Sequence, residues 1–152
     1  RFIQAQADIV VDQLNFGRYG STSRESLMLG RPVVCNIRPE EPSGQPRLVS
    51  LTQSPIQHAD ETMIQDVLRK LSADAALRRE IGLRGRAFAE HWFEKDACAA
   101  RFDDVYTGLH NGETAFEIQQ RHQTAWLEAM ELDGEVTGAK KPSSALLSES
   151  PS

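Results

Sequence analysis

The segment FGRYGSTSRESLMLGRPVV, residues 16–34, joins a glycine-rich loop to an apolar helical turn, a Gly-Arg-Pro step and a β-branched run. The preceding residues 7–12, ADIVVD, form a short apolar run between acids, which is typical of a buried parallel strand. Residues 32–37, PVVCNI, predict a second buried strand, and residues 22–29 predict a helix between the two. This order predicts a βαβ unit with parallel strands.

The glycine-rich loop has two alternative interpretations. Glycine lets a backbone approach a ligand closely, and a helix N-terminus offers unpaired N–H groups and a partial positive charge. The loop from Gly17 to Ser23 therefore suits a phosphate or diphosphate, with the hydroxyls of Ser21, Thr22 and Ser23 as additional donors. The alternative is a tight strand-to-helix turn, because the loop lacks both the NTPase phosphate signature and G-x-G-x-x-G. We expect Ser21 or Ser23 to cap the helix and Gly30 to end it.

Glu25 is expected in the first turn of this helix and also has two interpretations. Its charge could complement the helix dipole, which is worth about 0.3–1 kcal/mol. Its carboxylate could instead accept hydrogen bonds from two neighbouring sugar hydroxyls. The spacing of residues does not choose between these roles.

The remaining sequence predicts further helices and one more strand. The residues RLVSLT, 47–52, predict a short third strand, and residues 134–152 have the composition of a disordered tail. Helices with apolar stripes that we interpret as core faces are predicted at 60–72, 74–91 and 94–109, and a less regular one at 113–132. In the third helix the predicted core stripe consists of Cys98, Phe102, Val105 and Leu109. Gly82 and Gly85 interrupt the second helix, which indicates either close approach of another backbone or a break.

The composition excludes few classes of protein. A net charge of −5 argues against a nucleic-acid surface, and no apolar run approaches the roughly 20 residues that span a bilayer. Two distant cysteines indicate a reducing, cytoplasmic compartment, and Cys35 is interpreted as a small buried apolar residue. The four histidines lack metal-ligand spacing, so no metal site is predicted. Arg38 and Arg47 flank the loop after the second strand and could either reach an anion or be solvated charges.

Residues 7–34 resemble the donor-binding signature of GT-B glycosyltransferases, the large retaining family with a Glu-x7-Glu pattern. Tyr19-Gly20 matches the family's Phe-Gly step, and residues 25–34, ESLMLGRPVV, match its helix and next strand. Residues 67–106, with an Arg-x-x-x-Gly-x-x-x-Arg-like segment and a final Tyr, are similar to the family's closing helices. The resemblance covers about residues 7–109.

The resemblance implies an α/β fold with a Rossmann-like parallel sheet and flanking helices, formed by residues 1–109 as the C-terminal domain of a GT-B protein. Residues 110–133 would add a helix. The reaction implied is metal-independent transfer of a hexose, with retention, from a nucleoside-diphosphate sugar to a glycan, lipid-linked or protein acceptor. Glu25 would bind the ribose, while Gly17, Tyr19, Gly20 and Ser21 would lie against the diphosphate or the sugar. No catalytic residue is assigned.

Two features depart from the family pattern. The first glutamate of the motif corresponds to Gly17, for which Asp12 or Asn15 could substitute. In the family, the basic pair that holds the diphosphate lies upstream of this signature, and so does the acceptor domain. Both would precede Arg1, so we expect an N-terminal half as partner and a fragment that is not competent by itself.

Location and function each have alternatives. A peripheral position at the inner face of the membrane is an alternative to free cytoplasmic location. The alternative functions are a non-catalytic GT-B-like module that binds a partner protein and a sugar-nucleotide epimerase of related fold.

Overall fold

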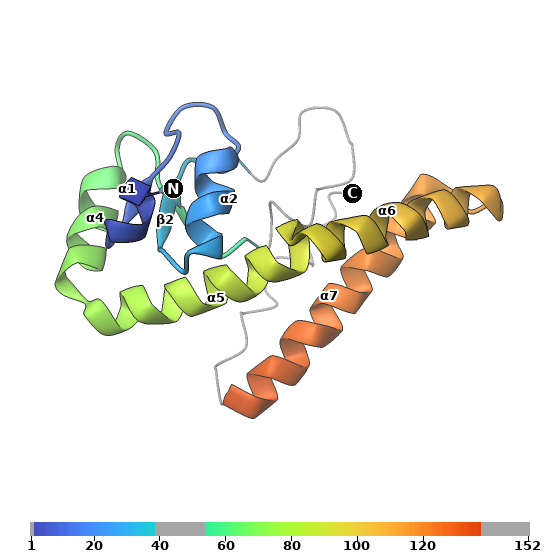
Figure 1. The fold of residues 1–152 in the computed structure, drawn as a ribbon. Coiled ribbons are helices and arrows are strands. Elements are labelled where there is room, and N and C mark those ends of the chain that lie inside the picture. The colour runs from blue at the N-terminus through green and yellow to red at the C-terminus, as the bar shows by residue number, and fades with distance from the viewer. Residues whose placement is uncertain (1, 39–53, 138–152) are drawn as a thin grey trace, which may run out of the picture. The chain divides into compact units, whose positions relative to one another are not determined.

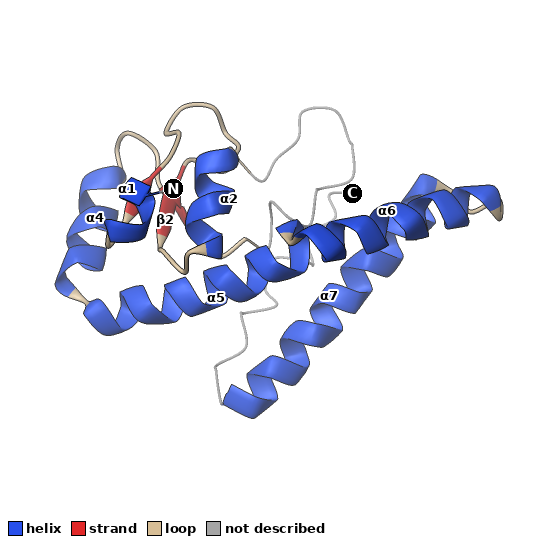
Figure 2. Cartoon of the chain, in the orientation of Figure 1, coloured by secondary structure: helices blue, strands red, loops and turns tan. Residues whose placement is uncertain are grey.

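The computed structural model describes residues 2–38 and 54–137, which form two compact units. The first unit comprises residues 1–102 and the second residues 103–152, so the division falls within one helix. Most of the described chain is helical, with one small sheet (Figure 2). The second unit contains the end of α6 (Lys95–His110) and α7 (Ala115–Thr137). The first unit contains α1 (Phe2–Gln6), β1 (Val10–Val11), α2 (Ser21–Met28), β2 (Val33–Cys35), β3 (Gln57–His58), α4 (Ile64–Ala73), α5 (Ala75–Phe93) and the start of α6.

The sheet has three parallel strands in the order β1-β2-β3. The register pairs Val10 with Val33 and Val34 with Gln57. The predicted βαβ unit is therefore confirmed, although both of its strands are shorter than the apolar runs that predicted them. The third strand was missed at Gln57–His58, because two residues without a β-branched run give no periodic signal. The third strand predicted at 47–52 lies outside the described residues.

Helix α2 ends at a glycine, as predicted. Gly30 adopts φ +66°, its N–H donates to the carbonyl of Leu27 at 2.8 Å, and the N–H of Arg31 donates to the carbonyl of Ser26 at 2.9 Å. These two bonds form a Schellman motif, which requires a left-handed residue that glycine adopts without a steric penalty. The turn directs the chain from α2 into β2.

Helix α5 is continuous through both of its internal glycines, so the predicted alternative of a break is wrong. It packs against α4 and α2 (Figure 1). A Cβ at Gly82 would collide with the carbonyl oxygen of Gly30 and lie 3.1 Å from its carbonyl carbon. A Cβ at Gly85 would lie 2.9 Å from Cδ2 of Leu27. The predicted close approach of another backbone is therefore confirmed at Gly82.

The core of the first unit lies between the sheet, α4 and α5. Its central cluster consists of Val34, Ala59, Leu71 and Ile81, all buried. The predicted apolar stripe of α4 packs against this cluster through Ile64, Val67 and Leu68. Helix α4 begins four residues later than predicted, because residues 61–63 form a turn.

The predicted core stripe of α6 is wrong in both units. In the first unit, Phe102 is 64% exposed and Cys98 is half-buried. In the second unit, Leu109 is 50% exposed and Val105 is half-buried. Helical spacing identifies an apolar stripe but does not supply a neighbouring element to cover it.

The second unit is a helical hairpin with a glycine turn. Gly112 adopts φ +87°, and the N–H of Glu113 donates to the carbonyl of Gly108 at 2.9 Å, which repeats the Schellman arrangement. Thr114 and Glu117 form a capping box at the start of α7: the Thr114 N–H donates to Oε2 of Glu117 at 2.7 Å. Helix α7 extends to Thr137, past residue 134 where the predicted tail begins, and residues 138–152 lie outside the described chain.

Candidate ligand-binding site

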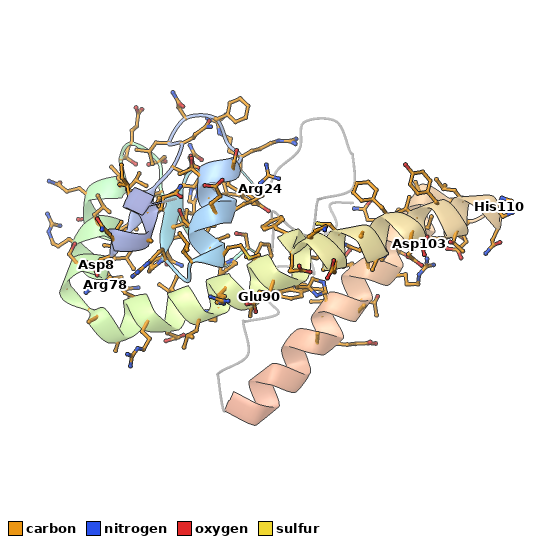
Figure 3. All side chains as sticks on the ribbon, in the orientation of Figure 1. Asp8, Arg24, Arg78, Glu90, Asp103 and His110 are labelled. Atoms are coloured by element: carbon orange, nitrogen blue, oxygen red, sulfur yellow. The ribbon has the colours of Figure 1, made fainter. Side chains whose placement is uncertain are left out.

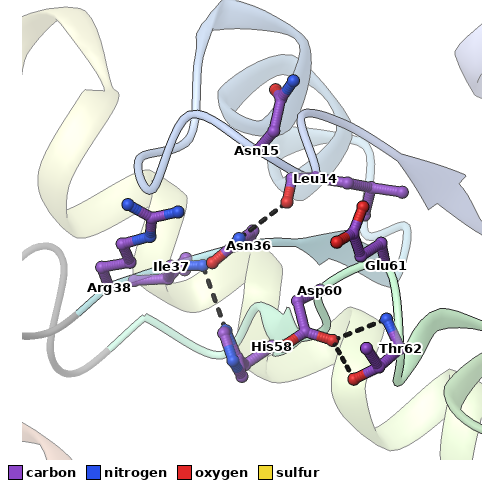
Figure 4. Close-up of a pocket in the computed structure, with 9 residues that line it drawn as sticks. All are labelled: Leu14, Asn15, Asn36, Ile37, Arg38, His58, Asp60, Glu61 and Thr62. Carbon is purple, nitrogen blue, oxygen red and sulfur yellow. Dashed lines mark hydrogen bonds between the residues drawn. The ribbon is translucent and has the colours of Figure 1, made fainter.

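The carboxyl ends of the three parallel strands meet at one edge of the sheet, where a cavity of about 520 Å³ opens. Its walls are formed by residues 14–15 after β1, residues 36–38 after β2, and residue 58 with residues 60–62 at and after β3 (Figure 4). In open α/β sheets, ligands bind in the crevice beyond the carboxyl ends of the strands. The volume lies within the roughly 300–1,000 Å³ of typical small-molecule sites.

In addition to the backbone hydrogen bonds between the strands, hydrogen bonds connect the three segments that form the cavity walls. The side-chain amide of Asn36 donates to the carbonyl of Leu14 at 2.6 Å, and the Ile37 N–H donates to Nδ1 of His58 at 3.1 Å. Because Nδ1 of His58 accepts this bond, the neutral imidazole carries its proton on Nε2. The Arg38 N–H donates to the carbonyl of Gly17 at 2.9 Å and so ties the glycine-rich loop to β2.

Asp60 has a structural role in the cavity wall. Its Oδ1 accepts hydrogen bonds from the N–H of Thr62 at 2.8 Å, the hydroxyl of Thr62 at 2.7 Å and the N–H of Met63 at 3.0 Å. The bond from the Thr62 hydroxyl is the main cause that holds the pKa of Asp60 below its ordinary value, and His58 contributes least. The Asp60 carboxylate is thus ionised and stabilises the turn that leads to α4.

Three other polar side chains of the cavity make no hydrogen bond or ion pair within residues 2–38 and 54–137: Asn15, Arg38 and Glu61. The aliphatic part of Arg38 lies over Gly17, where an added Cβ would meet Cδ of Arg38 at 3.1 Å and Cγ at 3.2 Å. Gly17 is buried and adopts φ +81°, so this position requires glycine for its conformation as well as for space.

The N-terminus of α2 is already bound to a carboxylate of the same chain. Oδ2 of Asp12 accepts from the N–H of Gly20 at 3.1 Å, the N–H of Ser23 at 3.3 Å and the hydroxyl of Ser23 at 2.5 Å. The N-cap is Gly20, so the prediction that Ser21 or Ser23 caps the helix is wrong. We predicted that the Ser23 hydroxyl would donate to a ligand, but this buried hydroxyl donates to Asp12 instead. Within the described chain, the N–H groups of Ser21 and Thr22 have no partner.

The structure distributes the five predicted site residues over three places. Gly17 lies beneath the side chain of Arg38, which lines the cavity, whereas Gly20 and Ser21 form the start of α2. The Tyr19 ring meets the Phe93 ring edge-on, with centroids 6.1 Å apart. None of the five is among the residues that line the cavity.

Glu25 lies in the second turn of α2 and is half-buried. The first turn contains no acidic residue, so the expectation that Glu25 lies in the first turn and complements the dipole there is wrong. Asp12 takes that role from outside the helix. The role of Glu25 in binding sugar hydroxyls stays a prediction.

Aromatic residues at the end of α5 support the glycine-rich loop and α2. The guanidinium of Arg24 lies 5.8 Å from the centroid of the Phe93 ring, and the Phe93 and Phe88 centroids lie 5.7 Å apart. Arg24 projects from α2 near these rings (Figure 3). A basic side chain is therefore present near the N-terminal half of α2, where a diphosphate was predicted.

Sequence reasoning missed the cavity residues His58 and Glu61 as a group. His58 was considered only for metal or acid–base chemistry, and Glu61 was placed inside a predicted helix. The signal that could have identified both is their position directly after a parallel strand, but that strand itself was not recognised.

Cys35 behaves as predicted and plays no nucleophilic part. It is fully buried, and its thiol donates to the carbonyl of Gln13 at 3.2 Å. Burial raises the pKa of the Cys35 thiol to about 11, with a smaller contribution from the charge of Asp12. The thiol therefore stays protonated at neutral pH.

Over the described ranges, no group of three or more His, Cys, Asp or Glu side chains is placed to hold a metal ion. None of the helices in those ranges has the length and apolar character that crossing a bilayer requires. Comparison of the sequence and structure with protein-family models, curated proteins and solved structures finds no match.

Proposed function

We propose that this chain is the donor-binding part of a retaining GT-B glycosyltransferase of the hexosyltransferase type. It would hold a nucleoside-diphosphate sugar for transfer to a glycan, lipid-linked or protein acceptor. The sheet would be part of a Rossmann-like domain, and the catalytic partner surface would come from an N-terminal half. The observation that carries the proposal is a glycine-rich loop and a helix start that follow β1 of a parallel sheet, whose carboxyl edge also has a cavity.

In this proposal Glu25 accepts hydrogen bonds from the two ribose hydroxyls. The N–H groups of Ser21 and Thr22, together with the cation of Arg24, would favour the diphosphate. Asp12 opposes it, since like charges about 4 Å apart repel by about 1 kcal/mol in water and about 4 kcal/mol near a protein surface. The diphosphate would therefore lie on the first two N–H groups of α2, away from those of Gly20 and Ser23 that Asp12 occupies.

Calorimetric titration of UDP, GDP and ADP into the chain tests this function. We expect one nucleotide to bind and Glu25→Ala to weaken it by about tenfold or more, the effect of losing hydrogen bonds to a carboxylate. Glu80→Ala is the matched control, because Glu80 is an exposed glutamate of α5 that pairs with Arg84 at 3.9 Å. Equal affinity of the wild-type and Glu25→Ala chains, or no binding of any nucleotide, would contradict the proposal.

The second candidate is a non-catalytic module of the same fold that binds a partner protein. One observation favours it: the Asp12 carboxylate occupies the helix N-terminus that the first proposal assigns to a diphosphate. If the chain is such a module, we expect that none of the three nucleotides binds. The same titration thus separates the two candidates.

A further inference from the structure

The lining of the cavity at the sheet edge is about half polar, and its polar side chains suit hydroxyl groups. Figure 4 shows Arg38 and Glu61 at opposite sides of the cavity, with Asn15 on the loop above them. Within the described residues these three side chains are unpartnered. Arg38 offers a planar set of donors, Glu61 offers two acceptor oxygens, and Asn15 offers both kinds of group. The Nε2–H of neutral His58 adds a further donor, because its Nδ1 is occupied by Ile37.

The charges of the lining argue against a phosphate in this cavity. The lining contains two carboxylates, of Asp60 and Glu61, and one guanidinium, of Arg38, so it is negative overall. A phosphate would gain from Arg38 and lose to both acids. A neutral ligand with several hydroxyl groups has no such penalty and can donate to Glu61 while it accepts from Arg38.

We infer that this cavity binds the sugar of the nucleotide-sugar donor, with Arg38 and Glu61 as the residues that recognise its hydroxyl groups. The inference rests on the proposed function, which supplies the nucleotide-sugar. Arg38 is suited to this role because Gly17 presents no side chain and the stem of Arg38 lies directly over it. The hydrogen bond from the Arg38 N–H to Gly17 holds the loop and the arginine together. The diphosphate and the sugar would then occupy neighbouring parts of the same edge, each beside groups of suitable charge.

The test compares each nucleoside diphosphate with its sugar conjugates on the same chain. UDP, GDP and ADP are titrated alongside their glucose, galactose and mannose conjugates, and the gain in affinity that the sugar provides is recorded. We expect Glu61→Gln and Arg38→Met each to reduce that gain by about tenfold, the effect of one charge-assisted hydrogen bond. Affinity for the free diphosphate should stay unchanged in both variants. Met keeps an unbranched stem over Gly17, so Arg38→Met removes the guanidinium without uncovering the loop.

Matched controls are Glu80→Gln and Arg79→Met, which remove the same groups from the exposed face of α5 and should change neither affinity. The inference is overturned if a diphosphate binds but no conjugate binds more tightly, or if the gain survives in both cavity variants. That result leaves the proposed function standing. Absence of binding by every diphosphate and every conjugate overturns the proposed function itself, and the inference with it.

Discussion

In the first unit, α5 approaches α2 so closely that Gly82 faces the backbone of Gly30. In the second unit, α6 and α7 meet through buried Ile118 against Gly108 and, beside it, through charged groups. Arg121 donates to Asp104 at 2.8 Å, and His122 lies 2.6 Å from the same carboxylate. The first contact depends on shape and burial and involves no charged side chain. The second also includes half-exposed charges, whose pairs contribute little individually and respond to pH and salt.

The two tryptophans allow each unit to be observed separately. Trp92 belongs to α5 in the first unit, and Trp126 is buried on α7 in the second. In a Trp126→Phe background, fluorescence reports on the first unit, and in a Trp92→Phe background it reports on the second.

The largest expected effect comes from Gly82→Ala. The new methyl group would collide with the Gly30 backbone, which the Schellman turn holds in place, and so should destabilise the first unit by about 3 kcal/mol despite the better helix propensity of alanine. Urea unfolding followed by Trp92 fluorescence measures the loss.

Gly85→Ala is the matched control for this substitution. Its Cβ would meet only the end of the Leu27 side chain, which can rotate, and alanine gains about 1 kcal/mol in the helix. The loss should therefore be less than half of that for Gly82→Ala. Equal losses would show that backbone approach is not what distinguishes Gly82.

A smaller effect is expected from Thr114→Ala in the second unit. The variant loses the hydroxyl that accepts from the Glu117 N–H at 3.3 Å, and capping losses of this kind cost about 1 kcal/mol. The Trp126 signal should shift in urea while the Trp92 signal stays in place. Thr124→Ala, an exposed position within α7, serves as the control, and a comparable shift there would rule out the capping explanation.

The smallest expected effect is a pH dependence of the second unit that comes from Asp104. The hydrogen bond from Arg121, followed by that from His122, holds the pKa of Asp104 below its ordinary value of 3.8. Since the folded pKa is lower than the unfolded one, Asp104 stabilises the folded unit at higher pH, and the contribution is lost as the pH falls through the lowered value. The Trp126 urea midpoint should therefore decrease below pH 3.8.

Glu117 also makes the second unit less stable in acid, because its hydrogen bonds from Thr114 hold its pKa below 4.5. The Asp104→Asn variant isolates the contribution of Asp104. Its midpoint should fall less steeply with acidification than that of the wild-type chain, and an identical slope would contradict a role for this carboxylate.

The local features of the chain were largely predictable from its sequence. The residues of α2 and the glycine that ends it were expected from an apolar turn followed by Gly-Arg-Pro, since the Schellman bonds join residues only three to five positions apart. The limits of α5 followed in the same way from helical spacing. The two-residue strand β3 could not be predicted, because it is defined by pairing with β2 rather than by its own residues.

The candidate site was predictable only in part. The glycine-rich loop and Glu25 were identified from their sequence, but the carboxylate at the α2 N-terminus comes from Asp12, eleven residues before Ser23. The cavity was not predicted, because its walls come from three segments that only strand pairing brings together.

The sequence by itself determined where helices form and that Gly30 ends α2, because these depend on interactions within one or two turns. Only the tertiary structure decided that Gly82 faces Gly30, that Asp12 occupies the start of α2, and that Phe102 and Leu109 stay exposed. The physical reason is that packing, charge pairing and burial depend on residues that are distant along the chain. A periodic pattern specifies which face of a helix is apolar, but the fold decides what that face meets.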